Sequence, residues 1–374
     1  MTIIVFILTI LILVLIHEFG HFIVAKKFNI KVLEFGFGIP PRAIGKKIGE
    51  TIYSLNWLPI GGFVKLLGED DDDPETSKNS RSFGMQNVWK RIAVVLAGVT
   101  MNLLLAWILF YIILGMQGFK AQIPLLVDFK FSGVTQSDEY IVIVDDVVDN
   151  SPAKQAGLKV GDRILAVNGT TIKTSQDLVD RIKAEAGREV SLTVSDVAKA
   201  NQHQVPLTPR LNPPPGQGAL GVALGSVAIA NIEYQTPIQK ILAGPVHSYN
   251  LTAFSFKVFS QTIQTAIAKK DLKPVQQTVS GPIGINSLIG EILKIKNPLI
   301  PYLELLAMLS LNLAVINVFP FPGLDGGRLA FLLWEAVTKK KVSPTIEKYI
   351  HSVGLVVLIV FILLVTASDI KKLF

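Results

Sequence analysis

The sequence predicts an α-helical membrane protein with four membrane-spanning segments and a soluble α+β domain inserted between the second and third. Half of the 374 residues are hydrophobic and only 17% are charged, whereas about a quarter are charged in soluble proteins. The apolar residues gather into four segments, 3–25, 92–114, 303–333 and 350–366, and crossing a bilayer takes roughly 20 residues. The stretch 124–211 is instead polar and rich in β-forming residues, which indicates a separate soluble domain.

Basic residues predict the orientation of the spans. They concentrate between spans one and two and between spans three and four, at Lys26, Lys27, Lys31, Arg42, Lys46, Lys47, Lys65, Lys90, Arg91, Lys339, Lys340, Lys341 and Lys348. Because positively charged connections stay in the cytoplasm, we expect both connections to be cytoplasmic. Both termini and the inserted domain are then extracytoplasmic, and we expect the first span to be retained rather than removed as a signal peptide. The net charge of +7 therefore follows from membrane topology and predicts no nucleic-acid partner.

A metal-binding motif, His17-Glu18-Phe-Gly-His21, lies inside the first apolar segment. Two histidines four residues apart share one helix face and can both bind a metal, and the glutamate beside the first can act on a water that the metal activates. Ionisable groups this deep in an apolar helix are costly unless they have partners, so a functional role is the default interpretation. A chance match that binds nothing would leave these groups uncompensated in lipid.

The third apolar segment contains a candidate third ligand, Asp325. Pro320 and Pro322 interrupt the helix just before this residue. Three glycines surround it: Gly323, Gly326 and Gly327. An unpaired carboxylate at this depth would be expensive, and a zinc ion would balance its charge. Two imidazoles and one carboxylate leave the fourth tetrahedral position open, as in catalytic rather than structural zinc sites.

The connection between the first two spans has the composition of β-hairpins. Segments 34–41 and 52–66 mix β-forming residues with glycine and proline. Their apolar content predicts that they lie against the membrane or the motif-bearing helix. There, a strand edge around Gly61, Gly62 and Phe63 could pair with an extended substrate. A re-entrant structural plug without substrate contact is the alternative that the sequence leaves open.

The inserted stretch has the pattern of a peptide-binding domain. Glycines within 151–169 suit tight turns before a strand, and the apolar positions of 175–185 recur at helical spacing. This run resembles a PDZ domain of the form found in bacterial envelope proteases. Such domains take up an extended peptide as an added strand, and we expect the groove near 140–144, facing the helix at 175–185. A domain that acts only as a spacer or size filter is the alternative.

Two further segments complete the organisation of the chain. A proline-rich linker at 212–216 leads to 237–268, where Phe254, Val258 and Ile263 predict one face of a helix on the outer membrane surface. We therefore divide the chain into the first two spans with their connection (1–123), the PDZ domain (124–211), the linker and amphipathic region (212–298) and the last two spans (299–374).

Together, these motifs resemble the site-2 protease family of intramembrane zinc metalloproteases. The resemblance rests on the histidine motif of the first span, the run from Asn317 to Gly327 in the third, the glycine-rich hairpins and the PDZ insert. Within the family, the chain is most similar to the bacterial regulator of sigma-E protease type. It departs from the best-known Gram-negative members by carrying one PDZ domain rather than two.

The resemblance implies Zn²⁺ bound by His17, His21 and Asp325, with Glu18 as general base and acid. It also implies candidates for holding the substrate backbone, namely Asn317 and Asn312. The expected function is cleavage of transmembrane segments of single-span membrane proteins in the bacterial cytoplasmic membrane, after another protease has removed the outer domain. Anti-sigma factors and remnant signal peptides are the implied substrates, and a peptide ligand of the PDZ domain is a further expected partner.

Two other functions fit parts of the sequence. A non-catalytic membrane PDZ adaptor on a protease-derived scaffold would be expected to have lost a metal ligand or the glutamate, but this chain keeps all four residues. A metal transporter would need more acidic residues along a continuous path through its spans. A cysteine nucleophile is excluded, because the chain has no cysteine. The sequence therefore favours the protease.

Overall fold

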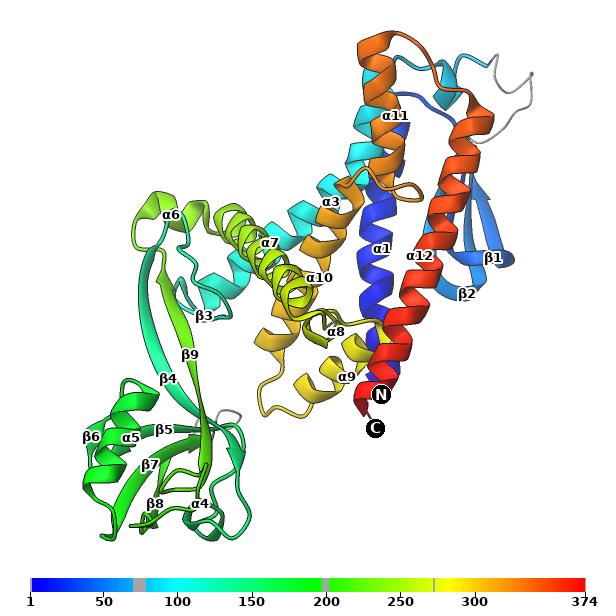
Figure 1. Cartoon of the computed structure of the whole chain (residues 1–374). Coiled ribbons are helices and arrows are strands. Elements are labelled where there is room, and N and C mark those ends of the chain that lie inside the picture. The colour runs from blue at the N-terminus through cyan, green and yellow to red at the C-terminus, as the bar shows by residue number, and fades with distance from the viewer. Residues whose placement is uncertain (1, 70–78, 197–201, 272, 374) are drawn as a thin grey trace. The chain divides into compact units, whose positions relative to one another are not determined.

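Within the residues that the structure describes, four helices are long and apolar enough to cross a membrane. They are α1 (Thr2–Lys27), α3 (Val88–Met116), α10 (Leu299–Val318) and α12 (Pro344–Leu373). The computed structural model describes residues 2–69, 79–196, 202–271 and 273–373. The chain forms two compact units: Met1–Met116 with Ile241–Phe374, which we call the membrane unit, and Gln117–Lys240, which we call the inserted unit (Figure 1).

The third apolar segment is divided into two helices, as Pro320 and Pro322 predicted, and the membrane-spanning helix covers 299–318 rather than the whole of 303–333. α10 ends at Val318, and α11 (Asp325–Thr338) begins after a turn. Pro320 and Pro322 in that turn lack the N–H that would continue the helical hydrogen bonds. Of the two helices, α10 alone has the length and composition of a span. Asp325 is thereby placed at the first residue of a helix.

Helix α3 is the centre of the membrane unit, because it contacts both α1 and α10. Leu13, Phe110 and Leu311 from the three helices share one buried core. The glycine of the histidine motif allows α1 and α3 to approach closely, since a Cβ on Gly20 would lie 2.3 Å from the main-chain oxygen of Ala97. The motif-bearing face of α1 is therefore packed against α3.

The connection between α1 and α3 forms strands, as its composition predicted. They are β1 (Val32–Ile48) and β2 (Thr51–Leu66), followed by a short 3-10 helix, η1 (Phe83–Met85). The two strands fold into a small sheet, in which 32–37 pairs with 62–66 and part of it, 34–37, also pairs with 52–55. The end of β2 is thus an edge of this sheet.

The turn between β1 and β2 is held to the end of α1 by ion pairs. Glu50 accepts hydrogen bonds from Arg81 and from Lys26, the latter in the last turn of α1. These bonds lower the pKa of the Glu50 carboxyl to about 2, so the carboxylate stays charged over the whole physiological range.

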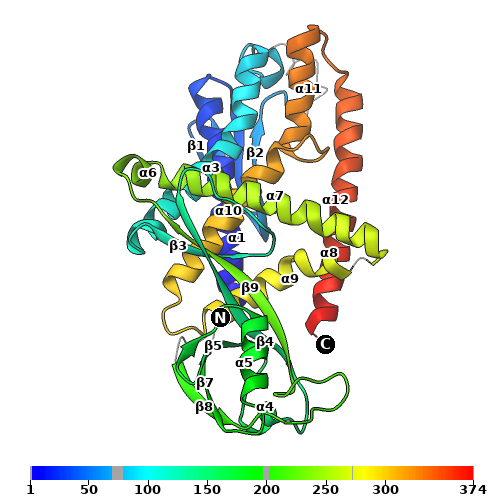
Figure 2. The same cartoon turned by 60° about the vertical axis from the view of Figure 1, so that its left-hand side comes forward.

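The amphipathic region folds as α6 (Pro237–Ile241), α7 (Ala243–Lys269), α8 (Lys273–Thr278) and α9 (Pro282–Ile292). Figure 2 shows α7 running across the helices of the membrane unit, and α7 contacts α3 and α10. Phe254 and Val258 of its expected apolar face are buried, whereas Ile263 is exposed. The face predicted from spacing therefore packs on protein through two of its three residues.

A buried carboxylate joins the start of α9 to the end of α12. Asp369 is 3% exposed, and its Oδ2 accepts hydrogen bonds from the main-chain N–H groups of Gly281 and Gly284, at 2.8 and 2.9 Å. A carboxylate at this position satisfies N–H groups that lack partners at a helix N-terminus. The last helix is thereby tied to the segment that precedes α10.

The inserted unit is built on a seven-stranded sheet of strand order β3-β9-β4-β5-β7-β8, in which β6 pairs with β5. Its strands are β3 (Lys120–Leu125), β4 (Thr135–Val147), β5 (Asp162–Val167), β6 (Thr170–Thr171), β7 (Val190–Asp196), β8 (Gln202–Leu207) and β9 (Val222–Glu233). Its helices are α4 (Pro152–Gln155) and α5 (Ser175–Ala184). Leu178 and Ile182 of α5 lie in the core that the sheet forms.

The unit extends beyond the expected 124–211 on both sides. β9 pairs with β4 along its whole length and with β3 over 228–233. The segment expected to begin a linker and amphipathic region therefore contributes a central strand.

The groove expected near 140–144 is closed by the chain itself, which corrects that prediction. Tyr140 pairs with Ala228 of β9, and Val142 pairs with Ser226 of β9 on one side and Ile164 of β5 on the other. β9 comes from far downstream, so spacing within the PDZ-like run did not reveal it. The strand edge beside α5 belongs to β9.

Two observations locate the free edge of β9 beside α5. The hydroxyl groups of Ser175 on α5 and Ser226 on β9 lie 2.6 Å apart. Because β3 covers only 228–233 of β9, residues 222–227 have no second strand neighbour within the described ranges.

Candidate metal centre

Three side chains from distant parts of the sequence meet inside the membrane unit. His17 and His21 lie one turn apart on α1, and Asp325 opens α11. The two histidine Nε2 atoms are 3.2 Å apart. Oδ2 of Asp325 is 3.0 Å from Nε2 of His17 and 3.2 Å from Nε2 of His21. The structure therefore brings together the three ligands expected from the sequence.

This spacing fits one small metal ion. Bonds of about 2.0–2.1 Å to a tetrahedral Zn²⁺ place neighbouring ligand atoms roughly 3.3 Å apart, close to the separations observed here. Two imidazoles and one carboxylate supply three of four positions, which leaves one position for water or substrate. The donor set therefore suits a catalytic zinc site.

Helix α3 provides the surface on which the two histidines rest. Nδ1 of His21 donates a hydrogen bond to the main-chain oxygen of Val94 at 2.8 Å, so the other ring nitrogen can act as a ligand. One turn further along, Gly98 leaves room for both rings. A Cβ there would lie 2.4 Å from Nε2 of His21 and 2.8 Å from Cε1 of His17.

Glycine residues also permit the turn that places Asp325 beside the two histidines. A Cβ on Gly326 would lie only 2.0 Å from the main-chain oxygen of Phe319, so α11 could not start so close to the end of α10 with a larger residue. Gly323 has a φ of +93°, and its N–H donates a hydrogen bond of 2.9 Å to Nδ1 of His351 on α12. The loop before Asp325 is therefore held by α12.

Glu18 lies beside the three ligands and next to the end of β2. Its carboxylate interacts electrostatically with His17, His21 and Asp325. A Cβ on Gly62 would lie 3.2 Å from Cγ of Glu18. The strand edge expected to receive substrate is thus adjacent to the expected general base.

The remaining candidates are less closely tied to the cluster. Asn312 is exposed and Asn317 half-buried on α10, and five residues of helix separate their directions by about 140°. The two amides therefore do not share one face. Gly61 has a φ of +80°, and the ring of Phe63 lies across Gly36, whose Cβ would be 2.3 Å from it.

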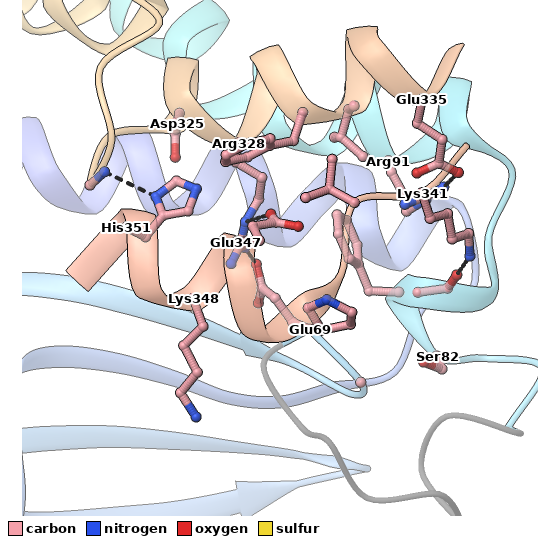
Figure 3. A pocket seen from close by; sticks show the side chains of 18 of the residues that line it. Glu69, Ser82, Arg91, Asp325, Arg328, Glu335, Lys341, Glu347, Lys348 and His351 are labelled. Carbon is pink, nitrogen blue, oxygen red and sulfur yellow. Dashed lines mark hydrogen bonds and ion pairs between the residues drawn. The ribbon is translucent and has the colours of Figure 1, made fainter. Parts of the chain in front are cut away.

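A polar cavity of about 790 Å³ extends from Asp325 between α11, α12 and the residues after β2 (Figure 3). Arg328, one turn after Asp325, pairs with Glu69, and its Nε lies 3.8 Å from Oε1 of Glu347 on α12. Near the other end of α11, Glu335 pairs with Arg91 of α3. These ion pairs therefore join α11, which carries Asp325, to α3, to α12 and to the residues after β2.

Sequence reasoning missed the contribution of α3. Val94, Gly98 and Asn102 recur every four residues along the face that meets the histidines. Asn102 is a buried amide in a membrane span, and this was the one signal that could have pointed to that face. The ion pairs of Arg328 left no local pattern in the sequence.

Comparison with known proteins agrees with the geometry. The sequence profile of peptidase family M50 matches residues 5–361. The chain belongs to peptidase family M50. This is the site-2 protease family, so the resemblance drawn from the motifs is confirmed.

Relatives in the M50 family match along almost their whole length. A protein of Clostridium perfringens is 34% identical over 359 residues, covering 96% of this chain and 95% of its own. The zinc metalloprotease RasP of Bacillus licheniformis is 27% identical over 451 residues, covering 100% of this chain and 99% of its own. The regulator of sigma-W protease RasP of Bacillus subtilis is 25% identical over 450 residues, with the same coverage.

Among solved structures, the crystal structure of the PDZ domain of an SdrC-like protein from Listeria monocytogenes aligns with this chain. The identity is 24% and the TM-score 0.20, covering 26% of this chain and 93% of that chain.

Proposed function

We propose that this M50 protein is a zinc-dependent endopeptidase that cleaves transmembrane segments of single-span membrane proteins. The observation that carries this proposal is the cluster of His17, His21 and Asp325 at tetrahedral spacing within a membrane unit, with Glu18 beside it. Relatives named zinc metalloproteases support zinc as the metal. The relative named as a regulator of sigma-W protease supports membrane-bound anti-sigma factors as the substrate class. Remnant signal peptides are the second class.

Zinc held by the three ligands would polarise the scissile carbonyl and make the attacking water easier to deprotonate. Glu18 would then take the proton from this water and return it to the leaving amine. His17 and His21 are held against α3, and Asp325 is held by the turn before α11, so the protein fixes the positions of these groups before substrate arrives.

The edge of β2 at Gly61, Gly62 and Phe63 would hold the substrate. A transmembrane helix keeps its amides in internal hydrogen bonds, so it has to unwind locally before attack. The unwound segment could add to the edge of β2 as a further strand. Gly62 carries no side chain beside Glu18, so a substrate backbone can approach there.

We place the protein in the bacterial cytoplasmic membrane, with the connections after α1 and α11 in the cytoplasm. This follows from the basic residues of both connections and the positive-inside rule. Both termini and the inserted unit would then be extracytoplasmic, and the cavity beside Asp325 would open toward the cytoplasm.

The inserted unit would act as a PDZ-like filter on substrate selection. Its candidate peptide site is the strand edge 222–227 of β9 beside α5, where an extended peptide could pair. A domain that excludes bulky substrates by size alone would not need this edge.

Removing the inserted unit tests the filter. Replacing 117–240 by a flexible linker is expected to leave cleavage of a truncated substrate within a few-fold of wild type. Substrates with intact outer domains, normally rejected, would then be cleaved. A second variant, Ser226→Tyr, places a bulky side chain at the β9 edge beside α5, and a change in selection by this variant would separate peptide binding from size exclusion. Loss of cleavage of the truncated substrate on deletion would contradict the filter.

The proposed activity is tested with purified protein in lipid nanodiscs and a substrate that has one span. We expect cleavage within the span, loss of cleavage after treatment with a zinc chelator, and recovery when stoichiometric zinc is added back. Bound zinc without cleavage of any of several substrates would instead favour a non-catalytic PDZ adaptor.

A further inference from the structure

The strongest feature that the proposed mechanism leaves unused is a buried amide on α3. Asn102 is 0% exposed, and its side-chain nitrogen is placed 3.2 Å from Nδ1 of His17. Its main-chain oxygen accepts a hydrogen bond of 2.8 Å from the hydroxyl of Ser310 on α10. Asn102 therefore lies at the meeting point of α1, α3 and α10, on the side of His17 away from the other ligands.

The hydrogen-bonding capacity of a histidine ring decides what Asn102 does there. A neutral imidazole carries one proton, and Nε2 of His17 can bind a metal only if that proton is on Nδ1. Nδ1–H then requires an acceptor. The oxygen and nitrogen of an amide have nearly the same shape, so turning the Asn102 amide by 180° exchanges Oδ1 with Nδ2 and brings Oδ1 to Nδ1 of His17 while the surrounding residues stay in place. As placed, Oδ1 is buried and has no hydrogen-bond partner among the described residues.

We propose that Asn102 is a positioning residue, whose Oδ1 accepts the Nδ1–H of His17 and thereby directs Nε2 toward His21 and Asp325. This inference rests on the proposed zinc site.

The second histidine is held in the same way from the same helix. Nδ1 of His21 donates to the main-chain oxygen of Val94, and Gly98 lies between the two acceptors and admits both rings. Val94, Gly98 and Asn102 are four residues apart, so they form one stripe of α3. This stripe supplies one acceptor for each histidine. At His17 it is the side-chain amide of Asn102 that lies at Nδ1, whereas the main-chain oxygen of Asn102 accepts from Ser310.

A purely structural role for Asn102 and the proposed positioning role predict that different variants of this residue are impaired. If the amide only filled space between helices, leucine would replace it well and a buried aspartate would be harmful. If it accepts the Nδ1–H of His17, aspartate keeps the acceptor and leucine removes it. Partners of this kind typically contribute a factor of about 10–100 in metal affinity.

The test measures zinc affinity by competition with a chromophoric chelator, using full-length protein in detergent or nanodiscs. Asn102→Leu is expected to weaken zinc binding about 10–100-fold, while Asn102→Asp stays within about threefold of wild type or binds more tightly. Thr100→Leu is the matched control, because Thr100 is exposed on the same helix and its hydroxyl donates to the main-chain oxygen of Leu96. Its zinc affinity is expected to equal that of wild type.

Each other outcome has a definite meaning. Wild-type affinity in Asn102→Leu, or equal losses in the leucine and aspartate variants, would overturn the positioning role. If Asn102→Leu does not fold, Asn102→Ala gives the same reading, since it also lacks the acceptor. Wild-type protein that binds no zinc would overturn the proposed function together with this inference.

Discussion

Replacing Glu18 by glutamine is expected to abolish cleavage while zinc remains bound. The three proposed ligands, His17, His21 and Asp325, are untouched, so metal content should stay at the wild-type value. Glutamine cannot take a proton from the attacking water, and loss of a general base typically costs roughly 10²–10⁴ in rate. The measurement pairs metal analysis of the purified variant with single-turnover cleavage of a substrate that has one span.

Glu291→Gln is the matched control for this change. Glu291 is exposed on α9, outside the metal cluster, so the same substitution there is expected to leave the cleavage rate unchanged. Cleavage by Glu18→Gln within tenfold of wild type would remove Glu18 from the role of base. Loss of zinc from this variant would indicate that the carboxylate helps to hold the metal.

Replacing Gly98 by alanine is expected to lower both zinc affinity and cleavage activity. The new methyl group would lie 2.4 Å from Nε2 of His21 and 2.8 Å from Cε1 of His17, well inside van der Waals contact. One or both rings have to leave their positions, or α1 and α3 have to separate. We expect zinc affinity to fall more than about 100-fold, beyond the effect of losing an orienting hydrogen bond. The chelator competition that measures the Asn102 variants measures this one.

Gly115→Ala provides the control on the same helix. A Cβ on Gly115 meets nothing within 4 Å among the described residues. Alanine is favoured over glycine inside a helix by up to about 1 kcal/mol. Gly115→Ala should therefore keep wild-type zinc affinity and melt no lower than wild type. Wild-type zinc binding by Gly98→Ala would mean that the histidines do not rest on α3 as the structure has them.

Much of the membrane unit could be predicted because its signals are local. A membrane span is recognised by a run of apolar residues. The pair His17 and His21 is recognised by a spacing of four residues within one helix. Asp325 was recognisable because it lies among prolines and glycines in an apolar run. A carboxylate in such a place is costly unless a partner of opposite charge balances it. Each of these inferences needs only neighbours in the sequence.

The end of the third span shows where such local inference stopped. Hydropathy extended the apolar segment over 303–333, and its prolines predicted an interruption but not the residue at which the spanning helix ends. The break at Val318 follows from those prolines together with the close approach of Gly326 to Phe319, which no hydropathy average contains.

The sequence by itself predicted the number of spans, the three proposed ligands and the family, since each depends on residue type and short-range spacing. Only the tertiary structure decided that β9 closes the groove expected beside β4, that Gly62 lies against Glu18, and that both histidines pack on α3. These features arise where segments far apart in the chain pack together. A contact between distant segments is selected by shape and hydrogen bonding at that one place, so the sequence of either segment alone does not name its partner.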